Sequence, residues 1–133
     1  MDRTLKIAGA ILAIVIIGAV LLFINPLAQQ TPAPSYPGNV TVYFFYGEEC
    51  PHCHAVMPFL SNLSGKYPQV DFRYLETWHH SENQTLAEAM NKNLGVTGAG
   101  VPEVVIGTNV LIGDRDIPVK LEALIQAELK KKQ

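Results

Sequence analysis

Cys50 and Cys53 carry the clearest chemistry in this chain of 133 residues. They are its only two cysteines and lie three positions apart, in the tetrapeptide Cys50-Pro51-His52-Cys53. Because two cysteines within one helical turn cannot join distant segments, their chemistry must be local. They follow an apolar, β-branched run and open a stretch in which apolar residues recur at helical spacing. We therefore expect Cys50 at the N-terminus of a helix.

A cysteine in that position is suited to thiol–disulfide exchange. Unpaired N–H groups and the helix dipole stabilise the thiolate, which is the nucleophilic form of cysteine. Helix geometry is expected to leave Cys50 exposed and to bury Cys53. Cys50 is therefore predicted to attack, and Cys53 to resolve the mixed disulfide. The Cys50–Cys53 disulfide would be the redox group, with no further cofactor and no bound metal.

Metal handling is the alternative interpretation of the same residues. Cysteine and imidazole are soft or borderline ligands that suit copper and zinc. The cluster Cys50-Pro51-His52-Cys53-His54 offers four such side chains, and His79 and His80 follow the second predicted strand, at the same end of the sheet. A copper- or zinc-binding module is therefore carried forward as a second function.

Residues 1–24 are predicted to anchor the chain in a membrane. Ile7 to Ile24 is an unbroken run of apolar residues and glycine. At a rise of about 1.5 Å per residue it spans roughly 27 Å, close to the hydrocarbon thickness of a bilayer. Arg3 and Lys6 precede the run, so the N-terminus should stay cytoplasmic and the rest should lie outside. A cleaved signal peptide is the alternative interpretation.

Residues 25–39 form a proline-rich linker, and residues 40–133 form a single domain. Pro26, Pro32, Pro34 and Pro37 make the linker a semi-rigid spacer. The formal net charge of −2 argues against a nucleic-acid partner, which would require a basic face.

Hydrophobic periodicity in the domain predicts the order β-α-β-α-β-β-α. A helix follows Cys50, and a capping box at Ser81–Gln84 opens a second helix with Leu86, Met90 and Leu94 facing inward. The last helix begins at Pro118. The strands are predicted at Val40–Tyr46, Val70–Glu76, Glu103–Ile106 and Val110–Ile112.

These features together resemble the thioredoxin-fold thiol–disulfide oxidoreductases. That family has a strand–CxxC–helix unit, a proline five residues after the second cysteine, matched by Pro58, and a cis-proline facing the CxxC, matched by Val101-Pro102. The tetrapeptide is similar to that of periplasmic disulfide-bond oxidases. The short element order and the stretch from Val101 to Asp114 look like glutaredoxin. The resemblance implies a four-stranded mixed sheet, and active-site tuning by Pro51, His52, Val101 and Pro102.

Several positions depart from the family pattern. Phe44 stands where thioredoxins have a buried acid, and Glu49 stands where they have a tryptophan. Asp114 replaces the second glycine of glutaredoxins. Glu103, beside Pro102, is either an exposed charge that tunes the site or an ordinary carboxylate at a strand edge.

The loop after the second strand supplies two further candidates. Trp78 either lines a substrate groove or covers the core. His79 either contacts substrate or lies solvated in the loop.

The predicted activity is disulfide exchange with exported proteins, and a membrane or extracytoplasmic redox partner would recycle the dithiol. His52 and the helix end favour a thiolate and hence an oxidising couple, whereas Glu48 and Glu49 oppose it. Both directions of electron flow are therefore retained.

Overall fold

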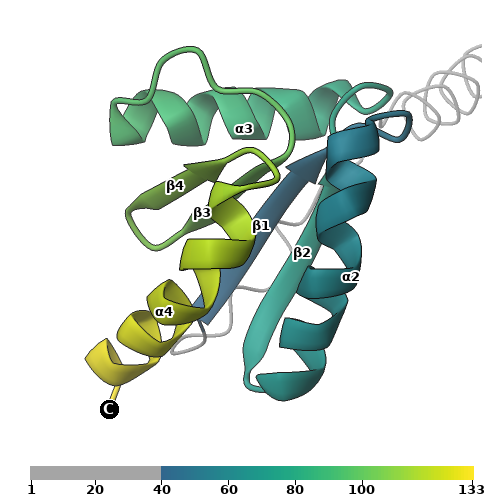
Figure 1. Cartoon of the computed structure of the whole chain (residues 1–133). Helices are drawn as coiled ribbons and strands as arrows, with labels where there is room; N and C mark the ends of the chain where they lie inside the picture. The colour runs from purple at the N-terminus through teal and green to yellow at the C-terminus, as the bar shows by residue number, and fades with distance from the viewer. Residues whose placement is uncertain (1–39) are drawn as a thin grey trace, which may run out of the picture. The chain divides into compact units, whose positions relative to one another are not determined.

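The computed structural model describes residues 40–133, which are coloured in Figure 1. The predicted anchor at 1–24 and linker at 25–39 lie outside the described residues. Among residues 40–133, no helix combines the length and apolar character needed to cross a membrane. The predicted element order is confirmed: β1 (Val40–Tyr46), α2 (Pro51–Lys66), β2 (Val70–Glu76), α3 (Ser81–Leu94), β3 (Glu103–Ile106), β4 (Asn109–Ile112) and α4 (Asp116–Lys131).

The four strands form one mixed sheet in the order β2-β1-β3-β4. Strand β1 pairs in parallel with β2 and antiparallel with β3, and β3 pairs antiparallel with β4. β-Branched and aromatic side chains along the whole of β1 suit this interior place, because a central strand is covered on both faces. Phe45 lies opposite Leu75 on one side and opposite Glu103 on the other.

The two faces of the sheet are covered differently. Successive side chains of a strand point to opposite faces, so Phe44 and Phe45 face opposite ways. Phe44 belongs to the apolar core formed with α2 and α4, which lie together in front of the sheet in Figure 1. Phe45 points to the other face, where it lines a pocket with residues of α3. The main core includes both cysteines, Val56 and Leu60 of α2, and Ile117, Leu121 and Ile125 of α4.

Helix α3 is attached to the sheet by hydrogen bonds, and the prediction that Leu86, Met90 and Leu94 face inward was wrong. Leu86 is exposed, and Met90 and Leu94 are only partly buried. The one buried residue of the helix is Asn91. The helix is rotated so that Asn83 donates to the carbonyl of Glu76 at 2.8 Å, while Asn91, two turns later, reaches Glu103. These hydrogen bonds fix the inward face of α3.

The predicted capping box was also wrong. His80 is the N-cap of α3 and makes no side-chain capping bond, and Ser81 is already the first helical residue. At the other end, Gly95 closes the helix in a left-handed conformation with φ 69°, which glycine adopts at no steric cost.

Helix α4 begins two residues before the predicted Pro118, at Asp116. Pro118 is tolerated in the first helical turn because its missing N–H has no partner there. Ile117, Leu121 and Ile125 are buried, with Leu124 and Leu129 partly buried beside them.

Candidate functional site

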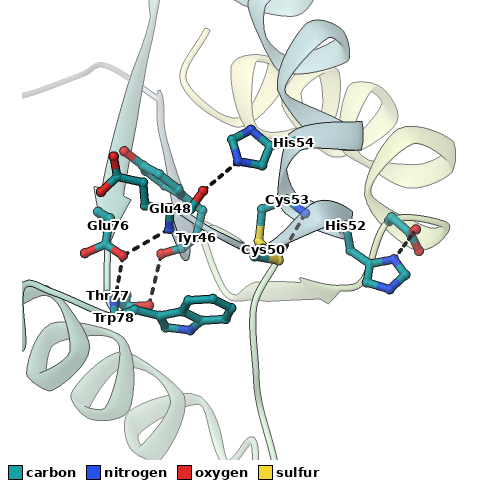
Figure 2. The surroundings of a disulfide bond; sticks show 10 residues. Tyr46, Glu48, Cys50, His52, Cys53, His54, Glu76, Thr77 and Trp78 are labelled. Atoms are coloured by element: carbon teal, nitrogen blue, oxygen red, sulfur yellow. Dashed lines mark hydrogen bonds and ion pairs between the residues drawn. A yellow bond between two sulfur atoms is a disulfide. The ribbon is translucent and has the colours of Figure 1, made fainter.

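The disulfide between Cys50 and Cys53 lies at the N-terminus of α2, where the sequence predicts the dithiol (Figure 2). Strand β1 ends at Tyr46, and the N–H of Cys50 closes a turn by donating to the carbonyl of Gly47 at 3.2 Å. Cys50 is extended and serves as the N-cap, so Pro51 is the first helical residue. A proline fits this position well, since its fixed φ is already helical.

The sulfur of Cys50 accepts a backbone hydrogen bond from Cys53, at 3.1 Å. The N–H groups of the first helical turn have no partner within the helix, and such donors favour negative charge on a nearby sulfur. The predicted exposure of Cys50 was wrong for this oxidised state: Cys50 is 4 % exposed and Cys53 is 0 % exposed. The bond to Cys53 holds the Cys50 sulfur against the core cluster to which both residues belong.

His52 is exposed and pairs with a residue far along the chain. Its Nδ1 donates to a carboxylate oxygen of Asp114 at 2.7 Å. The hydrogen bond from His52 lowers the pKa of Asp114, more than its partial burial raises it. The imidazole between the two cysteines is therefore held by a hydrogen bond to the turn before α4.

Glu76 joins the two loops that surround the disulfide. One carboxylate oxygen accepts from the backbone N–H of Glu48 at 3.2 Å and of Trp78 at 2.9 Å, and the other accepts from His79 at 2.8 Å. Burial by itself raises the pKa of Glu76, but the three N–H groups outweigh burial and lower the pKa. We call this arrangement, the Glu76 carboxylate with these three N–H groups, the Glu76 clamp. Figure 2 shows its bonds from Glu48 and Trp78.

The clamp orders the loop that holds Trp78 and His79. Nε2 of His79 donates to the carboxylate of Glu49 at 2.8 Å, and this hydrogen bond raises the pKa of His79. The indole of Trp78 lies against Gly47: a Cβ at position 47 would be 2.3 Å from a ring carbon. Trp78 is 53 % exposed, so it forms a wall at the surface beside the CxxC loop and is not a core residue.

The Val101-Pro102 peptide is cis, as the resemblance implies. Pro102 immediately precedes Glu103, which pairs with Phe45, so this peptide lies beside the end of β1 from which the CxxC loop departs. Val101 packs against the core cluster that contains both cysteines. The carbonyl of Pro102 accepts from the N–H of Gly113 at 2.8 Å, which fixes the strand end.

Phe44 occupies the position of the family's buried acid, and it is 1 % exposed in the core around Cys53. Glu103 does not replace that acid. It is 2 % exposed and pairs with Phe45, which places its side chain on the opposite face of the sheet from Phe44. Both sequence interpretations of Glu103 were wrong, because β3 is an interior strand and the carboxylate is buried.

The donors of the CxxCH segment do not converge on one point. The two sulfurs are bonded to each other, His52 contacts Asp114, and His54 donates to the carbonyl of Glu48 at 2.6 Å. Among residues 40–133, the three side chains with ligand atoms close enough to share an ion are Glu48, Glu49 and His79, all exposed.

Three contributors to the site were missed by sequence reasoning: Glu76, Asn91 and the pairing of Asp114 with His52. Glu76 is the last residue of β2 and leads into the loop that carries Trp78, so its position in the sequence could have marked it as part of the site. The partner of Asp114 lies 62 positions away and gives no local signal.

No protein-family model and no curated protein sequence matches this chain. Solved structures are similar in fold. Thioredoxin from Fasciola hepatica has a TM-score of 0.52 and 21 % identity, covering 68 % of this chain and 82 % of that one. Thioredoxin from Trypanosoma brucei brucei has a TM-score of 0.56 and 17 % identity, covering 70 % of this chain and 77 % of that one. Oxidised mitochondrial thioredoxin 3 from Saccharomyces cerevisiae has a TM-score of 0.53 and 25 % identity, covering 68 % of this chain and 79 % of that one.

The described chain therefore has the thioredoxin fold, with a four-stranded mixed sheet and three helices. Its closely spaced cysteine pair at a helix start fits a thiol–disulfide oxidoreductase.

The Glu76 clamp predicts a specific acid sensitivity. Because the folded-state pKa is lowered, the carboxylate stabilises the fold fully above its unfolded-state pKa of about 4.3. This contribution is lost as pH falls through the folded value. Glu76→Gln should lower the urea midpoint at neutral pH, and its difference from wild type should shrink in acid. Glu82→Gln, an exposed change on α3, is the control. A constant difference at all pH values would contradict a charged acceptor.

The pair of His52 and Asp114 predicts opposite shifts in reduction potential. His52→Ser removes the imidazole from the first turn of α2, where its protonated form would favour a thiolate on Cys50, and should make the couple more reducing, by about 30 mV for each tenfold loss of thiolate stabilisation. Asp114→Asn removes the opposing carboxylate and should make it more oxidising. Equilibration with a dithiothreitol buffer at low ionic strength measures both. Asp116→Asn is the control, and unchanged potentials in both variants would exclude the pair from redox tuning.

Proposed function

We propose that this protein is a membrane-anchored thiol–disulfide oxidoreductase that exchanges disulfides with extracytoplasmic proteins through Cys50 and Cys53. The observation that supports the activity is the disulfide at the N-cap of α2, with a backbone N–H directed at the Cys50 sulfur. The apolar run and its preceding charges support the membrane anchor and the outward orientation. Exported proteins would be the clients, and a membrane or extracytoplasmic redox partner would recycle the dithiol.

In the exchange, the Cys50–Cys53 disulfide is broken first, and the mixed disulfide between Cys50 and the client is broken second. When a client is oxidised, its thiolate attacks the Cys50 sulfur, the Cys50–Cys53 bond breaks, and Cys53 leaves as a thiolate and takes a proton. A second client thiolate then attacks the client sulfur of the mixed disulfide and releases Cys50. The client loses two electrons and two protons, which the two cysteines gain. Reduction of a client runs through the same steps in reverse.

The core around Cys53 constrains the proton transfer. Phe44 replaces the usual acid beside Cys53, and Glu103 lies across the sheet. The proton would therefore reach Cys53 through water or through the client. We do not propose the copper or zinc module, since the side chains of its cluster bind other partners in the described residues.

The two cysteines should behave differently when replaced one at a time. In the reducing direction Cys50 attacks and Cys53 resolves, so Cys53→Ser should accumulate mixed disulfides with client proteins. Cys50→Ser should accumulate few. Non-reducing electrophoresis of alkylated cell extracts, followed by reduction in a second dimension, separates the adducts. Equal trapping by the two variants, or trapping by Cys50→Ser alone, would reverse or remove the assignment.

The proposed topology has a direct test in cells. The full-length protein should pellet with membranes, and protease added to intact spheroplasts should digest the domain. A cytoplasmic protein assayed in the same sample controls for lysis. Protection of the domain until the membrane is opened would show that the orientation is the reverse of the one proposed.

A further inference from the structure

A pocket of about 350 Å³ lies between α3 and the sheet, next to the cis-proline peptide. Its apolar walls include Phe45 of β1, Trp78 of the loop after β2, and Val101. Asn91 of α3 and Glu103 of β3 supply polar atoms to the same lining. Trp78 and Val101 also border the CxxC loop and the core cluster that contains the cysteines. The pocket is therefore adjacent to the disulfide and lies on the face of the sheet that α3 covers.

The polar groups of this pocket have too few donors. Both carboxylate oxygens of Glu103 accept from the single amide nitrogen of Asn91, at 3.0 and 3.1 Å. The amide oxygen of Asn91 is buried and has no partner. Glu103 is 2 % exposed and Asn91 is 8 % exposed, so these groups depend on partners inside the pocket. Buried polar atoms are almost always paired. A protonated Glu103 has one O–H donor, whereas the carboxylate form leaves three acceptors facing one amide group and calls for an additional donor.

The charge of the lining indicates which donor fits. Two carboxylates, Glu88 and Glu103, line the pocket, and its lining includes neither lysine nor arginine. The exposed indole of Trp78 forms part of the wall, and an aromatic face attracts a cation. Ammonium and guanidinium groups are donors without acceptors, on long apolar stems. Such a side chain complements both the apolar walls and the acceptors.

We propose that this pocket binds a lysine or arginine side chain of the client polypeptide, with the cationic group donating to Glu103 and Asn91. The pocket would thereby select clients that carry a positive charge near the reacting cysteine. This inference rests on the proposed function, because it assigns a substrate class to that same exchange reaction.

The protonation of Glu103 would be coupled to this binding. Burial raises the pKa of Glu103, more than the bond from Asn91 lowers it, so burial opposes ionisation of this carboxyl group. A bound cation favours the carboxylate and expels the proton. Glu88 on α3 is the other charged group in the lining, whereas β1 and the loop after β2 present the uncharged Phe45, Thr77 and Trp78. Preference for a cationic client should therefore increase as pH rises.

Matched peptides test the proposal with the full-length oxidised protein. Each is a short peptide with two cysteines, used in excess over the protein. Lysine or the uncharged norleucine is placed in turn at every position that flanks either cysteine. An arginine series repeats the scan. Initial rates of peptide oxidation are measured by mass spectrometry after acid quenching. Because a neighbouring cation lowers the pKa of a thiol, each rate is divided by the thiolate fraction of its own peptide, measured from thiolate absorbance against pH.

With lysine or arginine at one or two of these positions, the peptide should be oxidised about tenfold faster than the matched norleucine peptide. A factor of this size is expected for one hydrogen-bonded charge. Glu103→Gln should bring this ratio close to one. Glu82→Gln removes a carboxylate from α3 outside the pocket and should leave the ratio unchanged. If Glu103→Gln does not fold, the wild-type rates alone decide: faster oxidation of the lysine or arginine peptide at one or two positions supports the proposal, and rates equal to norleucine at every position overturn it.

The possible outcomes separate the pocket from the proposed function. Oxidation of all peptides at equal rates, at every position and pH, would overturn the cationic subsite and leave the exchange activity intact. Failure to oxidise any peptide, with the Cys50–Cys53 disulfide verified beforehand, would overturn the proposed function and the subsite with it. A ratio that falls equally in Glu82→Gln and Glu103→Gln would assign the preference to the overall negative field and overturn the pocket.

Discussion

The carboxylate of Glu76 accepts hydrogen bonds from three backbone N–H groups in two separate loops, and the geometry around the disulfide depends on it. One loop carries Glu48 and leads into Cys50, and the other carries Trp78 and His79. Neither loop has regular secondary structure to hold it. Since backbone N–H groups near a buried carboxylate are strong donors, one side chain fixes the separation of two segments that meet only in the folded chain.

The two faces of the sheet have different tasks. On the face covered by α2 and α4, apolar packing dominates, and the disulfide is part of the core. On the α3 face, hydrogen bonds from Asn83 and Asn91 attach the helix, and a pocket remains between the helix and the sheet. The first arrangement positions the cysteines rigidly. The second leaves polar groups and space next to them, which suits recognition more than stability.

The sequence predicted the strands and the redox pair because their signals are local. Val40–Tyr46 is β-branched and aromatic throughout, and Cys50 and Cys53 share one helical turn, so their neighbours along the chain determine their surroundings. The orientation of α3 was not predictable in this way. Its leucines and Met90 suggested an apolar face, but the helix turns Asn83 and Asn91 inward because Glu76 and Glu103 offer acceptors there. Such partners become visible only when distant segments are brought together, as for His52 and Asp114.

The close contact of Gly47 with Trp78 has a consequence for how this site can diverge. Any side chain at position 47 would place its first carbon within 2.3 to 2.7 Å of the indole ring, so no residue larger than glycine fits while the tryptophan keeps its place. The two positions are therefore expected to covary, although they lie 31 positions apart in the sequence. A lineage could lose the glycine only after the aromatic ring had shrunk or moved, and the order of those two substitutions is constrained.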